Sequence, residues 1–104
     1  MGFNQYHEPA SELTEETRTL ARMFASLTEE TEAINWYQQR ISVEKDLDAI
    51  AIMKDAQKEE FKHFGMDLEF LLRKIPDWQT VIEPILFTTG NIVKEGKKGE
   101  KAAE

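Results

Sequence analysis

The chain has 104 residues, a hydrophobic share of 40%, a formal net charge of −7 at pH 7 and no cysteine. It is too short for more than one small domain, and its apolar content is low for a self-sufficient core, so we expect it to associate with copies of itself. The lack of cysteine excludes disulfides, thiolate metal ligands and thiol catalysis, which leaves oxygen and imidazole as metal ligands. The acidic balance disfavours nucleic acid and favours cations.

The N-terminal residues show no targeting pattern. Residues 1–7 have neither the basic stretch nor the apolar stretch of a signal peptide, and no apolar run in the chain approaches the ~20 residues of a membrane span. We therefore expect a soluble, cytoplasmic protein with no membrane partner. We assign residues 1–13 to an N-terminal arm.

The first regular segment has the periodicity of a packed helix. Apolar or small residues recur in alternating steps of four and three over 13–41, which predicts a helix from about Thr14 to Ser42. Thr14 is a suitable N-cap residue. Residues 43–46 break the pattern and predict a turn, in which Asp46 can cap the next helix.

A second helical stripe follows over 47–75, with Lys54 and Gln57 at positions where apolar residues are expected. This helix ends before Pro76, because proline disfavours helical geometry in the residue that precedes it. Two helices of similar length joined by a short turn predict an antiparallel hairpin over 14–75. The fold class is therefore all-α.

Beyond the hairpin, apolar residues between Trp78 and Leu86 recur at helical spacing, although Pro84 interrupts the hydrogen bonding of a helix there. We expect a short, bent C-terminal helical segment over 76–93 that packs on the hairpin or on a neighbouring chain. Residues 94–104 contain Lys, Glu, Gly and Ala without a large apolar residue, which predicts a disordered tail.

A Glu-x-x-His motif on the second helix suggests a metal site. Glu60 and His63 are one turn apart, and Glu30 lies in a row beside the main stripe of the first helix. Di-iron carboxylate bundles take one Glu from each of two helices and a Glu-x-x-His pair from each of the other two. One chain thus carries half of a di-metal site, so we expect two chains to form a four-helix bundle around it. These rows are expected to lie off the seam of the hairpin.

Carboxylate and imidazole ligands without a thiolate suit iron or manganese, and they also bind zinc. The motif itself is weak, because Glu-x-x-His arises by chance in a chain rich in Glu. A salt bridge between His63 and Glu59 or Glu60 is the simplest alternative. Trp36 and Tyr37, taken alone, are more often core or interface aromatics than redox groups.

Three carboxylates crowd the first helix, since Glu29 and Glu32 stand beside Glu30. Such crowding raises carboxylate pKa values unless cations neutralise the charge. It predicts a secondary site for a divalent cation such as Ca²⁺ at Glu29 and Glu32. A solvated acidic helix face is the alternative, and it is the stronger one for Glu29.

Several segments together resemble the encapsulated ferritins, over about residues 6–88. The resemblance rests on the string Glu-Glu-Thr-Glu-Ala-Ile-Asn-Trp-Tyr-Gln-Gln-Arg at 29–40, the string Glu-Glu-Phe-Lys-His at 59–63, His-Glu-Pro at 7–9 and Leu-Phe-Thr at 86–88. The combination is more specific than any one of these motifs.

The resemblance implies a two-helix chain that forms dimers, which assemble into an open, ring-shaped decamer. It also implies a ferroxidase site shared across a dimer interface. The resemblance implies that Glu30, Glu60 and His63 are the iron ligands and that Tyr37 and Trp36 lie beside the metals. It implies that Glu29 and Glu32 attract metal ions at the approach to the site.

Members of that family act as oxidising cargo: they convert Fe(II) to Fe(III) and depend on a surrounding encapsulin shell for storage. The resemblance therefore implies an encapsulin shell protein as a partner and an encapsulin nanocompartment as the location. Family chains usually end in a docking peptide with Gly and Leu, whereas residues 94–104 contain no Leu or Ile. The alternatives are a truncated chain, a chain excised from a fusion, and a protein that works unenclosed.

The functional hypothesis is a ferroxidase that uses O2 at a di-iron site. The first alternative is a non-catalytic helical scaffold or adaptor, or a plain metal-binding protein, whose assembly is indifferent to metal. A second is a di-iron oxidase or peroxidase of the rubrerythrin kind, but the chain lacks the cysteines of its electron-relaying centre.

Overall fold

The computed structural model describes residues 6–104, and this part of the chain consists of helices and connections without a strand. It forms two compact units, the first up to Glu69 and the second over Phe70–Glu104. The predicted all-α class is confirmed. No helix within residues 6–104 has the length and apolar character needed to cross a membrane. The elements are a 3₁₀ helix η1 (Ala10–Glu12) and the α-helices α1 (Glu15–Val43), α2 (Leu47–Lys74), α3 (Pro76–Ile82) and α4 (Ile92–Ala102).

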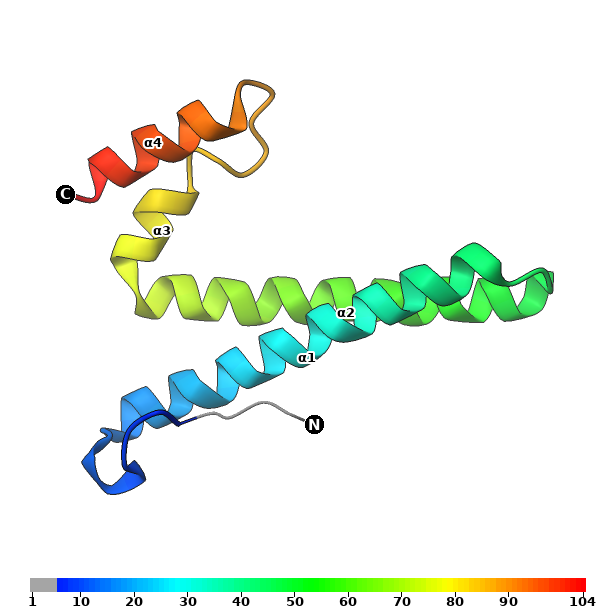
Figure 1. Ribbon diagram of the computed structural model, residues 1–104, viewed down its shortest axis with the longest axis horizontal. Helices are drawn as coiled ribbons and strands as arrows, with labels where there is room; N and C mark the ends of the chain where they lie inside the picture. Colours follow the sequence, from blue (N-terminus) through cyan, green and yellow to red (C-terminus); the bar gives the residue numbers. More distant parts are fainter. Residues whose placement is uncertain (1–5) are drawn as a thin grey trace. The chain divides into compact units, whose positions relative to one another are not determined.

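The two long helices run antiparallel and are joined by the short turn at 44–46 (Figure 1). Both helix starts have the predicted caps. The Thr14 side chain accepts a hydrogen bond from Thr17 N at 3.1 Å, and Asp46 Oδ1 accepts one from Ala49 N at 2.9 Å. Each cap satisfies a backbone donor that has no partner within its helix. Local signals therefore account for the boundaries of the hairpin.

A polar pair marks the seam between the long helices. Gln57 of α2 is only 7% exposed, and its amide nitrogen donates to the carbonyl oxygen of Ile34 at 3.2 Å and to Gln38 Oε1 at 3.0 Å. A buried amide without partners would cost free energy, and these bonds remove that cost. Gln57 thus occupies an apolar position of the stripe without a penalty, whereas Lys54 is exposed.

The apolar stripes are only partly covered in one chain. In the first unit Ala25 of α1 is 8% exposed, but two large apolar residues of α2 are not covered: Leu47 is 81% exposed and Phe61 is 50% exposed. Trp36, on the opposite side of α1 from the stripe, is also 50% exposed. A chain of this size and composition buries few large side chains by itself.

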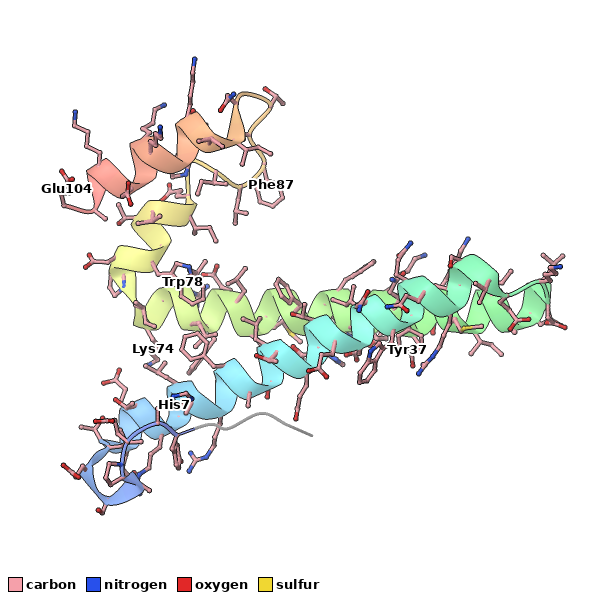
Figure 2. The ribbon with its side chains drawn as sticks, in the orientation of Figure 1. His7, Tyr37, Lys74, Trp78, Phe87 and Glu104 are labelled. Carbon is pink, nitrogen blue, oxygen red and sulfur yellow. The ribbon has the colours of Figure 1, made fainter. Side chains whose placement is uncertain are left out.

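In the second unit α3 packs against α4 (Figure 1). Pro76 occupies the first turn of α3, where its missing N–H is tolerated, and the helix ends at Ile82, before Pro84. The connection to α4 is held by a hydrogen bond that Gly90 N donates to Thr88 Oγ1 at 3.1 Å. The same connection contains Phe87, which has a backbone φ of 62° and a fully exposed side chain (Figure 2).

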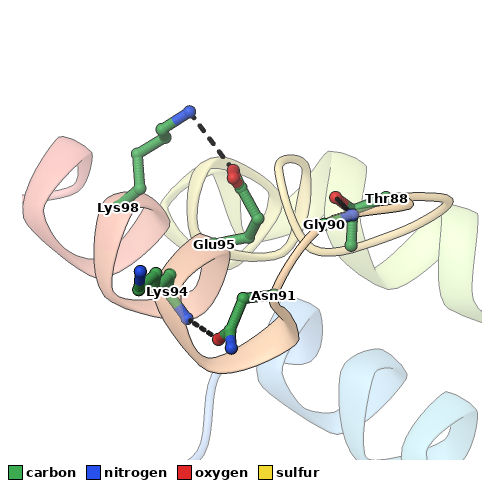
Figure 3. Close-up of polar contacts among 6 residues, drawn as sticks. All are labelled: Thr88, Gly90, Asn91, Lys94, Glu95 and Lys98. Carbon is green, nitrogen blue, oxygen red and sulfur yellow. Dashed lines mark hydrogen bonds and ion pairs between the residues drawn. The ribbon is translucent and has the colours of Figure 1, made fainter.

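The predicted disordered tail over 94–104 is wrong, because most of this segment belongs to α4. Asn91 caps the helix: its Oδ1 accepts a hydrogen bond from Lys94 N at 2.9 Å (Figure 3). Lys98 and Glu95 form an ion pair at 3.2 Å along the first turns. Composition alone suggests disorder, because the segment has few apolar side chains. The Asn91 cap and the packing against α3 stabilise the helix instead.

Gly99 allows the close approach of α4 to α3. It is buried, and a Cβ built on it would overlap the carbonyl oxygen of Val81 and lie 3.1 Å from Pro84 Cγ. At Gly96, by contrast, the nearest atom to an added Cβ is Ile85 Cδ1 at an ordinary 3.8 Å. Only one of these two glycines of α4 is therefore required by packing.

We expect Gly99→Ala to open the contact between α3 and α4, with a cost of about 1–3 kcal/mol for overpacking. Gly96→Ala is the matched control and should stabilise α4 by up to about 1 kcal/mol, because alanine is the better helix former. Amide hydrogen exchange over residues 92–102 measures both effects. Equal protection in the two variants would contradict the packing role of Gly99.

Candidate metal centre

Glu60 and His63 lie together on α2, as their spacing predicts. His63 Nδ1 is 3.4 Å from Glu60 Oε1, and the two side chains are 41% and 23% exposed. The adjacent Glu59 points elsewhere: it pairs with Lys62 at 2.9 Å, which lowers the pKa of Glu59. The Glu60–His63 contact is an ion pair when His63 is protonated, and the same two groups are ordinary ligands for one metal ion.

Glu30 of α1 is half-buried, and burial raises its pKa from 4.5 to about 7. A side-chain hydrogen bond with Asp67 adds to this shift, and so does repulsion from the carboxylates of Asp67, Glu60 and Glu29. Two of these neighbours, Glu60 and Asp67, belong to α2. Each of these contributions raises the pKa of Glu30, so its carboxyl group keeps a proton to a higher pH than an ordinary carboxyl group does.

The expectation that the Glu30 row lies off the hairpin seam is wrong. Glu30 is near enough to Asp67 and Glu60 of α2 in the same chain for these carboxylates to raise its pKa. Residue spacing places a row on a helix, but the rotation of α1 against α2 decides what that row faces. Asp67 was not predicted as a site residue, although it follows His63 by four residues and shares its helix face.

Two buried oxygens in this cluster lack partners. Glu30 Oε2 and Asp67 Oδ2 are shielded from solvent, and neither has a hydrogen-bond donor within the described part of the chain. Anionic oxygens in this state are costly unless a proton or a cation lies beside them. Hard oxygen ligands with one imidazole fit iron or manganese. Within residues 6–104, however, no three or more His, Asp or Glu side chains of one chain are arranged to hold a metal ion.

Tyr37 and Trp36 lie further along α1 toward the turn. Tyr37 is half-buried, and the guanidinium carbon of Arg40 lies 5.4 Å from the centre of its ring (Figure 2). Trp36 borders a shallow depression together with Gln39 and Arg40. Neither aromatic residue is among the groups that act on the Glu30 carboxylate. Their predicted closeness to the metals therefore stays a prediction.

Glu29 and Glu32 are exposed on α1. Glu29 is near enough to Glu30 to raise the pKa of that carboxyl. Glu32 borders a separate shallow depression, which is also lined by Thr28, Thr31 and Asn35. The secondary cation site at these two residues stays a prediction.

Comparison with known proteins identifies the family of the chain. The sequence matches the EncFtn-like family over residues 5–89. The chain belongs to this family of encapsulated ferritin-like proteins. The resemblance that the motifs at 29–40 and 59–63 indicated is therefore confirmed.

The EncFtn-like chain is similar to two named relatives. It is 44% identical over 85 residues to a "Ferritin-like protein" of Thermotoga maritima, which covers 82% of this chain and 75% of the relative. It is 39% identical over 89 residues to an "Encapsulated ferritin-like protein" of Rhodospirillum rubrum, which covers 86% of this chain and 64% of the relative. This chain thus spans just under two thirds of the length of the second relative.

A solved structure supports the ferritin-like fold of the EncFtn-like chain. The crystal structure of protein ne0167 from Nitrosomonas europaea superimposes with a TM-score of 0.81 at 38% sequence identity. The similarity covers 86% of this chain and 98% of that one. The arrangement of the helices is therefore shared with a protein whose structure has been determined by experiment.

Proposed function

We propose that this EncFtn-like chain is a ferroxidase, which oxidises Fe(II) to Fe(III) with O2 at a two-iron site shared by two copies of the chain. The observation that carries the proposal is the pair of buried oxygens without donors, Glu30 Oε2 and Asp67 Oδ2. They lie in one cluster with Glu60, which contacts His63. Membership of a ferritin-like family supports iron as the metal.

Iron is the substrate here, and each Fe(II) ion loses one electron to O2. Glu30, Glu60 and His63 of each copy would hold the iron. Carboxylates are hard anionic ligands that stabilise Fe(III) more than Fe(II), which favours loss of the electron. Tyr37, as a neighbour of these ligands in the assembled protein, would orient them through hydrogen bonds.

A second copy is needed because one chain supplies only part of the set of metal ligands. Residues 6–104 of a single chain offer no complete metal-holding group, and apolar side chains such as Trp36 and Phe61 are half exposed. Pairing of two hairpins would bury such surface and bring two sets of ligands together. The full proposal is a dimer that assembles into a ring-shaped decamer, with Glu29 and Glu32 attracting Fe(II) or Ca²⁺ at the approach to each site.

The name of the Rhodospirillum rubrum relative suggests the partner. That relative is an encapsulated ferritin-like protein, and family membership extends this association to the present chain. We therefore propose an encapsulin shell protein as the partner and the interior of a cytoplasmic encapsulin nanocompartment as the site of iron storage. Oxidised iron would leave the ring for that enclosed space.

One alternative has support in the exposed aromatic residues. Trp36 and Phe61 are each 50% exposed, which is also what a non-catalytic helical scaffold or adaptor would present to its neighbours. Such a scaffold would assemble in the same way with and without metal. A ferroxidase with shared sites would instead assemble more completely once Fe(II) is bound.

Anaerobic titration of the metal-free protein with Fe(II), followed by exposure to air, tests the proposal. We expect saturable binding near one iron per chain, formation of dimers or larger assemblies, and a rise of Fe(III) absorbance faster than that of iron in buffer. Absence of binding, or oxidation no faster than in buffer, would reject the ferroxidase and leave the scaffold.

A further inference from the structure

The connection from α3 to α4 presents apolar side chains to solvent. Phe87 is fully exposed, and Ile92 and Val93, the first two residues of α4, are 67% and 66% exposed. These three residues lie within seven consecutive positions of the chain, and we call them the C-terminal patch. Single exposed apolar residues are common on protein surfaces, whereas a group that includes a fully exposed aromatic ring is typical of a surface that binds another protein.

The backbone that carries Phe87 is held in place on both sides. Before it, Leu86 N donates a hydrogen bond to the carbonyl oxygen of Ile82 at 3.1 Å, and after it, Gly90 N donates to Thr88 Oγ1 at 3.1 Å. Phe87 itself has a φ of 62°, which bulky residues rarely adopt. Strained residues of this kind gather at functional sites. A ring on a fixed backbone also loses little conformational entropy when a partner covers it.

The turn of the helical hairpin has an exposed apolar pair of its own. Val43, the last residue of α1, is 76% exposed, and Leu47, the first residue of α2, is 81% exposed. Of the four charged side chains at 43–48, three are carboxylates and one is a lysine. This hairpin tip, residues 43–48, therefore combines apolar surface with a net negative charge.

The charge beside the C-terminal patch has the opposite sign. Lys97 follows Val93 by four residues, so the two side chains share one face of α4. Lys94 and Lys97 are both exposed, while the acidic Glu95 is paired with Lys98 at 3.2 Å (Figure 3). The patch thus matches the hairpin tip in apolar character and complements it in charge, as the two sides of a protein interface do.

We propose that the hairpin tip of one copy of this chain docks on the C-terminal patch of a neighbouring copy. Phe87 is the apolar anchor of this contact, and Lys97 faces the carboxylates of the tip. Every copy carries both surfaces, so the contact can be made by all copies of a closed assembly. The inference rests on the self-association in the proposed function, but not on iron chemistry.

Sedimentation velocity over a range of protein concentrations tests the contact, under anaerobic conditions with a chelator and with Fe(II). We expect Phe87→Ser and Leu47→Ser each to weaken the formation of assemblies larger than a dimer about 10–100-fold, because each removes a large apolar side chain from the contact. Phe87→Gly should weaken it equally. Glycine adopts a φ of 62° without strain, so this variant removes the ring and leaves the fold of the connection intact.

A charge exchange tests whether these two surfaces meet each other. Lys97→Glu should weaken the larger assemblies, and adding Asp48→Lys at the hairpin tip should restore part of the loss. Lys101→Glu is the matched control, because it reverses the same charge one turn further along α4 and should change nothing. Failure of Asp48→Lys to restore assembly, or weakening by Phe87→Ser but not by Leu47→Ser, would overturn the hairpin tip as the occupant of the patch.

The same experiment separates this inference from the proposed function. An unaltered protein that stays monomeric with and without Fe(II) would reject both the docking contact and the proposed assembly. Assembly that neither Phe87→Ser nor Phe87→Gly changes would reject only the docking contact. The rate of Fe(II) oxidation is a separate readout, and a slow rate in a protein that assembles through Phe87 would reject the ferroxidase alone.

Discussion

Glu60→Gln is expected to slow oxidation of Fe(II) by about a hundredfold or more, while Glu59→Gln leaves the rate unchanged. Loss of a group that only orients a ligand already costs about 10–100-fold, so loss of a ligand should cost at least the upper end of that range. Glu60 lies 3.4 Å from His63 and is mostly buried. Glu59 is exposed and pairs with Lys62, although it is the adjacent residue.

The two glutamine variants form a matched pair, because each removes one charge at neighbouring positions of one helix. Stopped-flow recording of Fe(III) absorbance gives the rates, and far-ultraviolet circular dichroism checks that helicity is preserved. His63→Ala should lose fast oxidation in the same way. Rates like that of the unaltered protein in both Glu60→Gln and His63→Ala would reject these residues as ligands.

The metal-free protein should lose stability as pH rises from about 4.5 to about 7. Burial, aided by contact with Asp67, raises the pKa of Glu30 from 4.5 to about 7. The folded state therefore binds more protons than the unfolded state between these pH values. The resulting contribution of Glu30 to the free energy of unfolding is complete at low pH and is lost as the pH passes 7. The expected loss is about 1–3 kcal/mol, from about 1.4 kcal/mol per pKa unit less screening by solvent.

Urea unfolding of chelator-treated protein between about pH 5 and pH 8 measures this dependence. Glu30→Gln is the control, since glutamine has nearly the same shape and does not ionise. The Glu30→Gln protein should not lose stability over this pH range, and above pH 7 it should be more stable than the unaltered protein. Parallel pH profiles for the two proteins would contradict the raised pKa. An added divalent metal should reverse the trend, because it binds the deprotonated carboxylates.

Local chemistry accounts for what could be predicted from the sequence alone. Thr14 and Asp46 have side-chain oxygens that cap helices, and Pro76 ends one, so the hairpin boundaries depend only on neighbouring residues. Glu60 and His63 are one turn apart on any α-helix, so their contact also follows from spacing. The family resemblance rested on strings within these two helices, at 29–40 and 59–63, together with the short strings at 7–9 and 86–88.

Other features depended on how the elements pack. The order of the C-terminal residues 92–102 depends on Gly99, which lets α4 approach α3, and a composition rich in Lys and Gly does not reveal that contact. The partial exposure of Phe61 likewise depends on how far α1 covers α2.

The pairing of Glu30 with Asp67 was decided only by the tertiary structure. These residues are far apart in the sequence, and their contact requires one particular rotation and register of α1 against α2. Heptad spacing assigns each residue to a row on its own helix, but many rotations of α1 against α2 would bury a similar apolar area. The sequence by itself therefore determined the two long helices, the hairpin between them and the ligand types, whereas packing decided which carboxylates lie near one another and which oxygens are left without a partner.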